Sequence, residues 1–169
     1  IEGALRARGI APGLMRRFAM ERWPHVDPRW VVAERERARA EAREAAGVPI
    51  VLTDRDAGAC EAARANAERA GVAGDVEVVQ CALSDVDLSS MGPAGLVLTN
   101  PPYGLRVSEG ADLRALYARL GDVVRHGGRG WHLALLVPDQ RLIAPTRLRF
   151  DTLLRTSNGG ISVGVHRSR

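Results

Sequence analysis

The sequence contains only two cysteines, no lysine, and few aromatic residues, which make up 4% of its 169 residues. Cys60 and Cys81 are too few for a disulfide framework and match no zinc-ligand spacing, so we expect a reducing, cytoplasmic setting and no metal. No apolar run approaches the ~20 residues that a membrane-spanning helix needs, so we expect no membrane partner. The chain begins at Ile1 without a signal peptide, which favours a piece of a longer protein.

All 24 basic residues are arginines, and they exceed the 20 acidic residues to give a formal charge of +4. Arginine suits phosphate contacts, but a GC-rich genome also explains its abundance, and we favour that as the larger cause. Four arginines cluster around Trp23 and Trp30 in the sequence, namely Arg16, Arg17, Arg22 and Arg29. This mixture fits either a nucleic-acid groove or a solvated surface with two packed tryptophans.

Apolar runs typical of strands alternate with helical patterns along the chain. Strands are expected over 50–53, 76–81, 95–99 and 131–137, helices over 1–9, 30–46, 57–70 and 112–125, and an antiparallel hairpin over 148–156 and 161–166. Asp27-Pro28 and Asp56 supply caps for the second and third of these helices. The alternation predicts one α/β domain spanning 1–169, with a mostly parallel sheet and helices on both faces.

The segment Asn100-Pro101-Pro102-Tyr103 directly follows the apolar strand 95–99, which we expect to be buried. Ligands of open α/β sheets bind at the carboxyl ends of the strands, where this segment would lie. Its two prolines remove two amide donors, which leaves the Asn100 side chain and the carbonyls of Asn100 and Pro101 as acceptors beside an aromatic ring. The pattern favours a site for a planar group with an exocyclic amine over an ordinary turn after a strand.

Two carboxylates follow other strands of the predicted sheet. Asp54 ends the strand 50–53, where an acid commonly accepts hydrogen bonds from the ribose of a nucleotide-like cofactor, or else forms the turn. Asp85 follows the strand 76–81 and is a candidate for the adenine amino group, although we favour a loop-forming role for its Ser-Asp pair.

The Asn-Pro-Pro-Tyr segment resembles the amino-methylating branch of class I S-adenosylmethionine-dependent methyltransferases. Further segments narrow the resemblance to bacterial THUMP-associated RNA methyltransferases, above all those that methylate guanine N2 of 23S rRNA. These segments are Ile1-Glu2-Gly3-Ala4-Leu5, Ile10-Ala11-Pro12-Gly13-Leu14, Arg16-Arg17-Phe18-Ala19, Glu21-Arg22-Trp23-Pro24, Asp54-Arg55-Asp56, Ala63-Arg64-Ala65-Asn66-Ala67 with Ala70-Gly71, and Ser157-Asn158-Gly159-Gly160. The resemblance covers nearly the whole chain.

The resemblance implies a Rossmann-like fold, S-adenosylmethionine as cofactor and RNA as partner, with rRNA expected first and tRNA next. It assigns the target base to Asn100, Pro101, Pro102 and Tyr103, and the cofactor to Asp54, Asp85 and Asn100. The glycine-rich loop of the family, its strand and the THUMP domain are missing, and Cys81-Ala82 replaces the usual acid of the third cofactor motif. We therefore expect an N-terminally truncated catalytic domain.

Other activities share parts of this pattern. An adenine-N6 methyltransferase acting on RNA or DNA and a tRNA guanine-N2 methyltransferase use the same amine chemistry. A protein glutamine methyltransferase shares the Asn100 motif but not the segment 1–24, and a non-catalytic RNA-binding remnant is an alternative of another class. A dinucleotide dehydrogenase is disfavoured because the Gly-x-Gly-x-x-Gly fingerprint is absent. His126 and His132 are expected to be structural.

Overall fold

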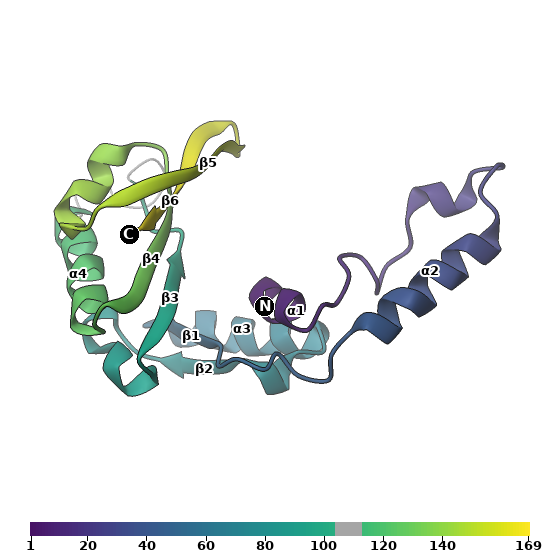
Figure 1. The fold of residues 1–169 in the computed structure, drawn as a ribbon, viewed down its shortest axis with the longest axis horizontal. Coiled ribbons are helices and arrows are strands. Elements are labelled where there is room, and N and C mark those ends of the chain that lie inside the picture. The colour runs from purple at the N-terminus through teal and green to yellow at the C-terminus, as the bar shows by residue number, and fades with distance from the viewer. Residues whose placement is uncertain (104–112) are drawn as a thin grey trace. The chain divides into compact units, whose positions relative to one another are not determined.

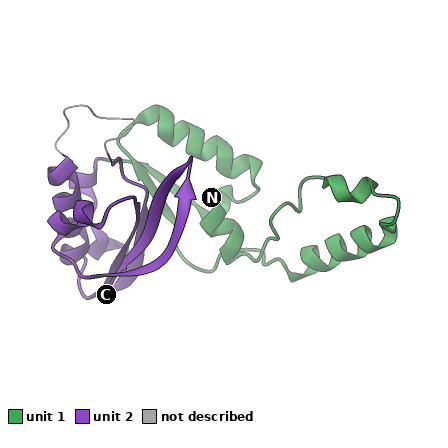
Figure 2. Ribbon diagram, turned by 90° about the horizontal axis from the view of Figure 1, so that it is seen from above, with its two compact units in different colours: residues 1–81 green, residues 82–169 purple. Residues whose placement is uncertain are grey.

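The computed structural model describes residues 1–103 and 113–169, which form two compact units (Figure 2). Residues 1–81 form the first unit and residues 82–169 the second. The expected helix start at Asp112 lies outside the described residues.

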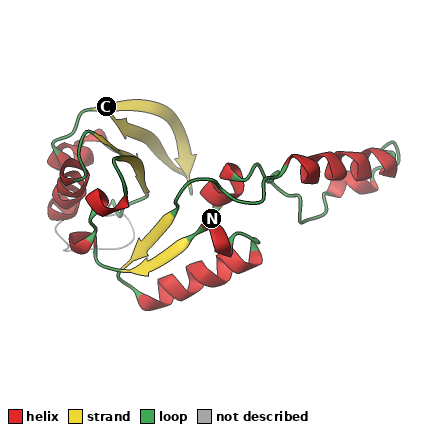
Figure 3. Ribbon diagram, turned by 60° about the horizontal axis from the view of Figure 1, so that its bottom comes forward, coloured by secondary structure: helices red, strands yellow, loops and turns green. Residues whose placement is uncertain are grey.

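Helices and strands alternate as the sequence predicts (Figures 1 and 3). The α-helices in the described ranges are α1 (Glu2–Ala7), α2 (Pro28–Glu41), α3 (Ala57–Arg69) and α4 (Leu113–His126). The strands are β1 (Val51–Asp54), β2 (Glu77–Gln80), β3 (Ala94–Thr99), β4 (Gly130–Val137), β5 (Phe150–Asn158) and β6 (Ile161–Ser168). Short 3-10 helices are η1 (Ala19–Arg22), η2 (Ala73–Asp75), η3 (Leu83–Asp85), η4 (Leu88–Met91) and η5 (Gln140–Thr146).

The first unit contains a two-stranded parallel sheet of β1 and β2, in which Asp54 is aligned with Gln80. Helix α3 contacts both strands. Its N-cap is Asp56 as predicted, because the Asp56 carboxylate accepts a hydrogen bond of 2.7 Å from the amide of Ala59. A small core of Ala4, Ala67 and Val72 joins α1 to α3.

Helix α2 begins as predicted, with Asp27 as N-cap and Pro28 in its first turn. It ends at Glu41, however, and the expectation that it continues to Ala46 was wrong. The reason is tertiary: the amide of Arg43 donates to the carbonyl of Arg8 at 2.7 Å, and the Arg8 guanidinium donates to the Arg43 carbonyl at 2.9 Å. These bonds to the end of α1 take the place of helical bonds.

The second unit contains a four-stranded sheet with the order β3-β4-β6-β5. Strands β3 and β4 are parallel, and the predicted C-terminal hairpin joins β4 antiparallel through β6. The hairpin turns at Gly159 and Gly160, whose φ angles of 57° and 82° favour glycine.

Helix α4 packs its apolar face on this sheet and forms the main core of the unit. The buried members of this core include Tyr117, Leu120, Val123, Val124, Leu133, Leu135, Val137 and Ile143. Gly121 lets α4 lie directly against η5, because a Cβ at this position would be 2.1 Å from the Thr146 carbonyl oxygen.

Strand β3 is less buried than the sequence predicts. Leu96 and Leu98 are 53% and 73% exposed, whereas Val97 on the opposite face packs against the core. Alternate residues of a strand face opposite sides, and only the face that carries Val97 meets the core that includes α4. The expectation of a buried strand before Asn100 was therefore wrong for the face that carries Leu96 and Leu98.

Among the described residues, no helix combines the length and apolar character needed to cross a membrane.

Candidate active site

The segment Asn100-Pro101-Pro102-Tyr103 leaves the carboxyl end of β3, where Thr99 is aligned with Leu135 of β4. Pro101 is buried and anchors the segment, while Asn100 beside it is exposed. The Asn100 carboxamide has no hydrogen-bond partner among the residues that the structure describes. Its oxygen is therefore free to accept a hydrogen bond from a ligand.

Helix α4 contacts this segment through the side chain of Tyr117. Tyr117 is only 1% exposed, and its hydroxyl donates to the Pro102 carbonyl at 3.3 Å. Burial, with a smaller contribution from Tyr103, raises the pKa of Tyr117 to about 12, so the hydroxyl keeps its proton. Sequence reasoning missed Tyr117. Its position between Leu116 and Leu120, on the predicted apolar face of the helix, could have indicated that its side chain is buried there.

Tyr103 is partly exposed and is close enough to Tyr117 to affect its pKa. It is thus near the Pro102 carbonyl that Tyr117 contacts. An aromatic ring of this kind, accessible on part of its surface, can stack on a planar ligand.

In the first unit, Asp54 lies exposed at the carboxyl end of β1. One carboxylate oxygen, Oδ1, accepts a hydrogen bond of 2.9 Å from the amide of Asp56, so Asp54 does form the turn into α3. Its second oxygen has no partner among the described residues. The Asp54 carboxylate therefore fits ribose hydroxyls as well, since it can accept from them without breaking the turn.

Asp85 lies exposed at the end of η3. Its Oδ1 accepts a hydrogen bond of 3.0 Å from the Ser84 hydroxyl, and its amide donates to the Ala82 carbonyl. These bonds agree with the loop-forming role, and contact with an adenine amino group stays a prediction.

The side chains of His126 and His132 bond to backbone carbonyls. Nδ1 of His126 donates to the Asp122 carbonyl at 2.6 Å, and Nδ1 of His132 donates to the Ser168 carbonyl at 3.2 Å. Within the described part of the chain, no group of three or more His, Cys, Asp or Glu side chains is arranged to hold a metal ion.

Known proteins resemble this chain in both sequence and structure. It is 34% identical over 166 residues to ribosomal RNA large subunit methyltransferase K/L of Shewanella baltica (strain OS185), and 37% identical over 167 residues to the protein of that name from Allochromatium vinosum. These alignments cover 95% of this chain but only 23% and 22% of the relatives, so the chain spans less than a quarter of their length.

The crystal structure of SMU.472, a methyltransferase complexed with SAH, matches with a TM-score of 0.87 at 28% identity. The match covers 97% of this chain and 43% of SMU.472. The α/β arrangement is therefore the Rossmann-like fold of class I methyltransferases, as predicted. The family described as RMKL-like, methyltransferase domain, matches residues 1–163. The chain belongs to this family of S-adenosylmethionine-dependent methyltransferases.

Proposed function

We propose that this chain is the catalytic domain of an RNA methyltransferase that modifies an exocyclic base amine, with guanine N2 of large-subunit rRNA as the first candidate. The single observation that carries the proposal is the exposed Asn100 carboxamide at the end of β3, which has no hydrogen-bond partner among the described residues and is next to two prolines and Tyr103. The names of the Shewanella and Allochromatium relatives support rRNA over tRNA. The two cysteines are both unpaired, which supports a cytoplasmic location.

An exocyclic amine of guanine is a poor nucleophile because its lone pair is delocalised into the ring. The Asn100 side-chain oxygen and the Pro101 carbonyl would accept its two hydrogens and orient the lone pair. The same two oxygens would stabilise the positive charge that develops on nitrogen as the new bond forms. Tyr103 would stack on the base, which must leave its helix to reach the site.

S-adenosylmethionine would supply an electrophilic methyl group, and Asp54 would hold its ribose hydroxyls. Asp85 is the candidate for the adenine amino group. After the carbon–nitrogen bond forms and the carbon–sulfur bond breaks, the methylated amine is acidic and loses a proton to water. The described residues around Asn100 therefore need no strong base.

The test is Asn100→Ala in the full chain, measured for methyl transfer to rRNA and, by calorimetry, for affinity toward S-adenosylmethionine. We expect methyl transfer to fall by about 100-fold or more, as for loss of one preorganised polar group, with little change in cofactor affinity. Asn66→Ala is the matched control, because this asparagine of α3 is bonded to Arg69.

The outcomes of these measurements distinguish the proposed function from its alternatives. Equal loss of methyl transfer and cofactor affinity would contradict the assigned role of Asn100. Mass spectrometry of the nucleosides identifies the base, and methylated adenine in place of methylated guanine would change the substrate. A wild-type chain without cofactor affinity would favour the non-catalytic RNA-binding alternative.

A further inference from the structure

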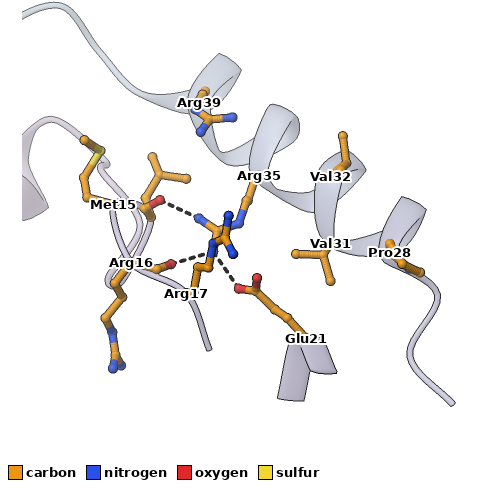
Figure 4. Close-up of a pocket in the computed structure, with 10 residues that line it drawn as sticks. Met15, Arg16, Arg17, Glu21, Pro28, Val31, Val32, Arg35 and Arg39 are labelled. Atoms are coloured by element: carbon orange, nitrogen blue, oxygen red, sulfur yellow. Dashed lines mark hydrogen bonds and ion pairs between the residues drawn. The ribbon is translucent and has the colours of Figure 1, made fainter. Parts of the chain in front are cut away.

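The proposed active site leaves a cluster of arginines and tryptophans in the first unit without a role. It lies on the segment 11–41, here called the arm, which consists of a loop, η1 and α2. Between the loop and α2 lies a pocket of about 470 Å³, which is large enough for a nucleotide (Figure 4).

Arg35 of α2 holds the walls of this pocket together. Its guanidinium donates to the carbonyls of Leu14 (2.6 Å) and Arg16 and to the carboxylate of Glu21 (2.7 Å), as Figure 4 shows. The amide of Phe18 and then Arg35 lower the pKa of Glu21, so this carboxylate stays charged and neutralises Arg35. Glu21 is the only acid among the residues that line the pocket.

The other cations of the pocket exceed its single acid in number, although the charge of Arg17 also acts on Glu21. Arg16, Arg17 and Arg39 line it and are exposed, and none forms an ion pair within the described ranges. The Arg16 guanidinium is held over the Phe18 ring, 4.6 Å from its centroid. By contrast, exposed arginines elsewhere on α2 are paired, such as Arg37 with Glu34 and Glu41. The pocket is therefore a local site of positive charge.

Aromatic and apolar surface lies on the same arm. Trp30 is 67% exposed at the start of α2, and Trp23 is 54% exposed just after η1. Exposing two indole rings to water is unfavourable, and flat aromatic rings next to arginines are the combination that binds unstacked bases together with their phosphates. A protein partner would account for the tryptophans but leaves unexplained why three arginines at one pocket form no ion pair among the described residues.

We propose that the arm binds a single-stranded segment of the RNA substrate, with Arg16, Arg17 and Arg39 contacting phosphates and Trp30 stacking on a base. The identity of the RNA as substrate rests on the proposed function. Binding by the arm is separable from methyl transfer, because it uses none of the residues assigned to the active site.

The test measures the affinity of the full chain for a short fluorescent single-stranded RNA by anisotropy over a series of salt concentrations. The combined variant Arg16→Gln, Arg17→Gln and Arg39→Gln should weaken binding at least tenfold at low salt. The slope of log affinity against log salt should also fall by about 2, since each single-strand phosphate contact contributes about 0.7. The matched control is Arg37→Gln, Arg141→Gln and Arg169→Gln, which removes the same charge from arginines paired with acids.

Stacking is tested separately. Trp30→Ala should weaken RNA binding by about fivefold or more, and Trp30→Phe should restore most of the affinity because a phenyl ring still stacks. Thermal melting of each variant is compared with that of the wild type. If Trp30→Ala does not fold, the outcome is decided by the arginine variant and Trp30→Phe.

Equal RNA affinity in the arm variant and its charge control would overturn the inference, even if Asn100→Ala abolishes methyl transfer. Loss of S-adenosylmethionine affinity in the arm variant would also overturn it, because the arm would then be structural. RNA binding through the arm by a chain that methylates no RNA would support the inference while the proposed function fails. Unchanged RNA affinity together with loss of a protein partner would assign the arm to that partner instead.

Discussion

The hydroxyl of Tyr117 forms a hydrogen bond that links the main core of the second unit to the proposed base-binding segment. Its hydroxyl reaches the Pro102 carbonyl at 3.3 Å, which is long for an O–H···O bond. Tyr117→Phe removes this bond and keeps the ring in the core. We expect kcat of methyl transfer to fall by about two- to fivefold, in keeping with the ~0.5–1 kcal/mol of a weak hydrogen bond. The Km for S-adenosylmethionine should not change.

A merely structural role for Tyr117 would give another result. The Phe variant would then lose thermal stability while its kcat stayed at the wild-type value. With a pKa of about 12, Tyr117 stays protonated. The ratio of the wild-type kcat to the kcat of Tyr117→Phe should therefore be independent of pH between about pH 6 and about pH 9.

His166 is a buried histidine whose protonation opposes folding. It is 3% exposed, and its Nδ1 lies 3.1 Å from Oγ1 of Thr152. Burial, and then the charge of Arg155, lowers the pKa of His166 below 6.5. Below pH 6.5, His166 binds a proton in the unfolded chain but not in the folded chain. The contribution of neutral His166 to the free energy of unfolding is therefore complete above pH 6.5 and decreases as the pH falls below it.

The measurement is the denaturant midpoint at about pH 7.5 and at about pH 5.5. We expect the midpoint of the wild type to decrease between these values and that of His166→Gln to decrease less. His25→Gln is the control, because His25 is exposed. Equal decreases of the denaturant midpoint in the wild type and in His166→Gln would show that His166 does not cause the loss of stability at low pH.

Single residues also show how far the candidate site could be predicted from sequence. Asn100 and the two prolines could be singled out because they are adjacent in the sequence and follow a strand, and their place after β3 is confirmed, whereas their roles stay predictions. Tyr117 was missed because its contact with Pro102 joins residues 15 positions apart, and its spacing alone is equally typical of a core residue. The turn formed by Asp54 follows from a local bond to Asp56, whereas its proposed ribose contact needs a ligand.

At the scale of elements, Gly121 controls how closely α4 approaches η5. A Cβ there would be 2.1 Å from the carbonyl oxygen and 2.6 Å from the Cα of Thr146, and backbone cannot move aside cheaply. Gly121→Ala should therefore lower the free energy of unfolding by roughly 1–3 kcal/mol despite the higher helix propensity of alanine. The control is Gly3→Ala in α1, where the added Cβ meets nothing within 4 Å. Denaturant unfolding measures both, and equal stability of the two variants would contradict the packing argument.

Helix starts and strand positions were predictable because they depend on local signals. Asp27-Pro28 and Asp56 determine where α2 and α3 begin, and both caps are present. The end of α2 was predicted wrongly because bonds between Arg43 and Arg8, 35 positions apart, replace the helical pattern. The burial of β3 was predicted wrongly because a run of apolar residues does not reveal whether both faces of a strand are covered.

At the scale of the whole chain, the two units differ in the size of their hydrophobic cores. Among the residues that the structure describes, nine buried ones form the main core of the second unit, and they include large side chains such as Tyr117, Leu133 and Leu135. The corresponding cluster of the first unit has three buried members, two of which are alanines. Because the hydrophobic contribution scales with buried apolar area, the second unit should have the higher local stability.

Hydrogen exchange of the full chain, followed by mass spectrometry, tests this difference. Amides of β4 and α4 should exchange more slowly than those of β1, β2 and α3, because opening the first unit exposes less apolar surface. Leu135→Ala should accelerate exchange in β4 and α4, since truncating a buried leucine costs about 2–5 kcal/mol. Val72→Ala, at the smaller core, should act mainly on α3 and β2. Equal protection in both sets of elements, or the same response to both substitutions, would mean that the chain opens as one cooperative unit and that the size of the local core does not determine its stability.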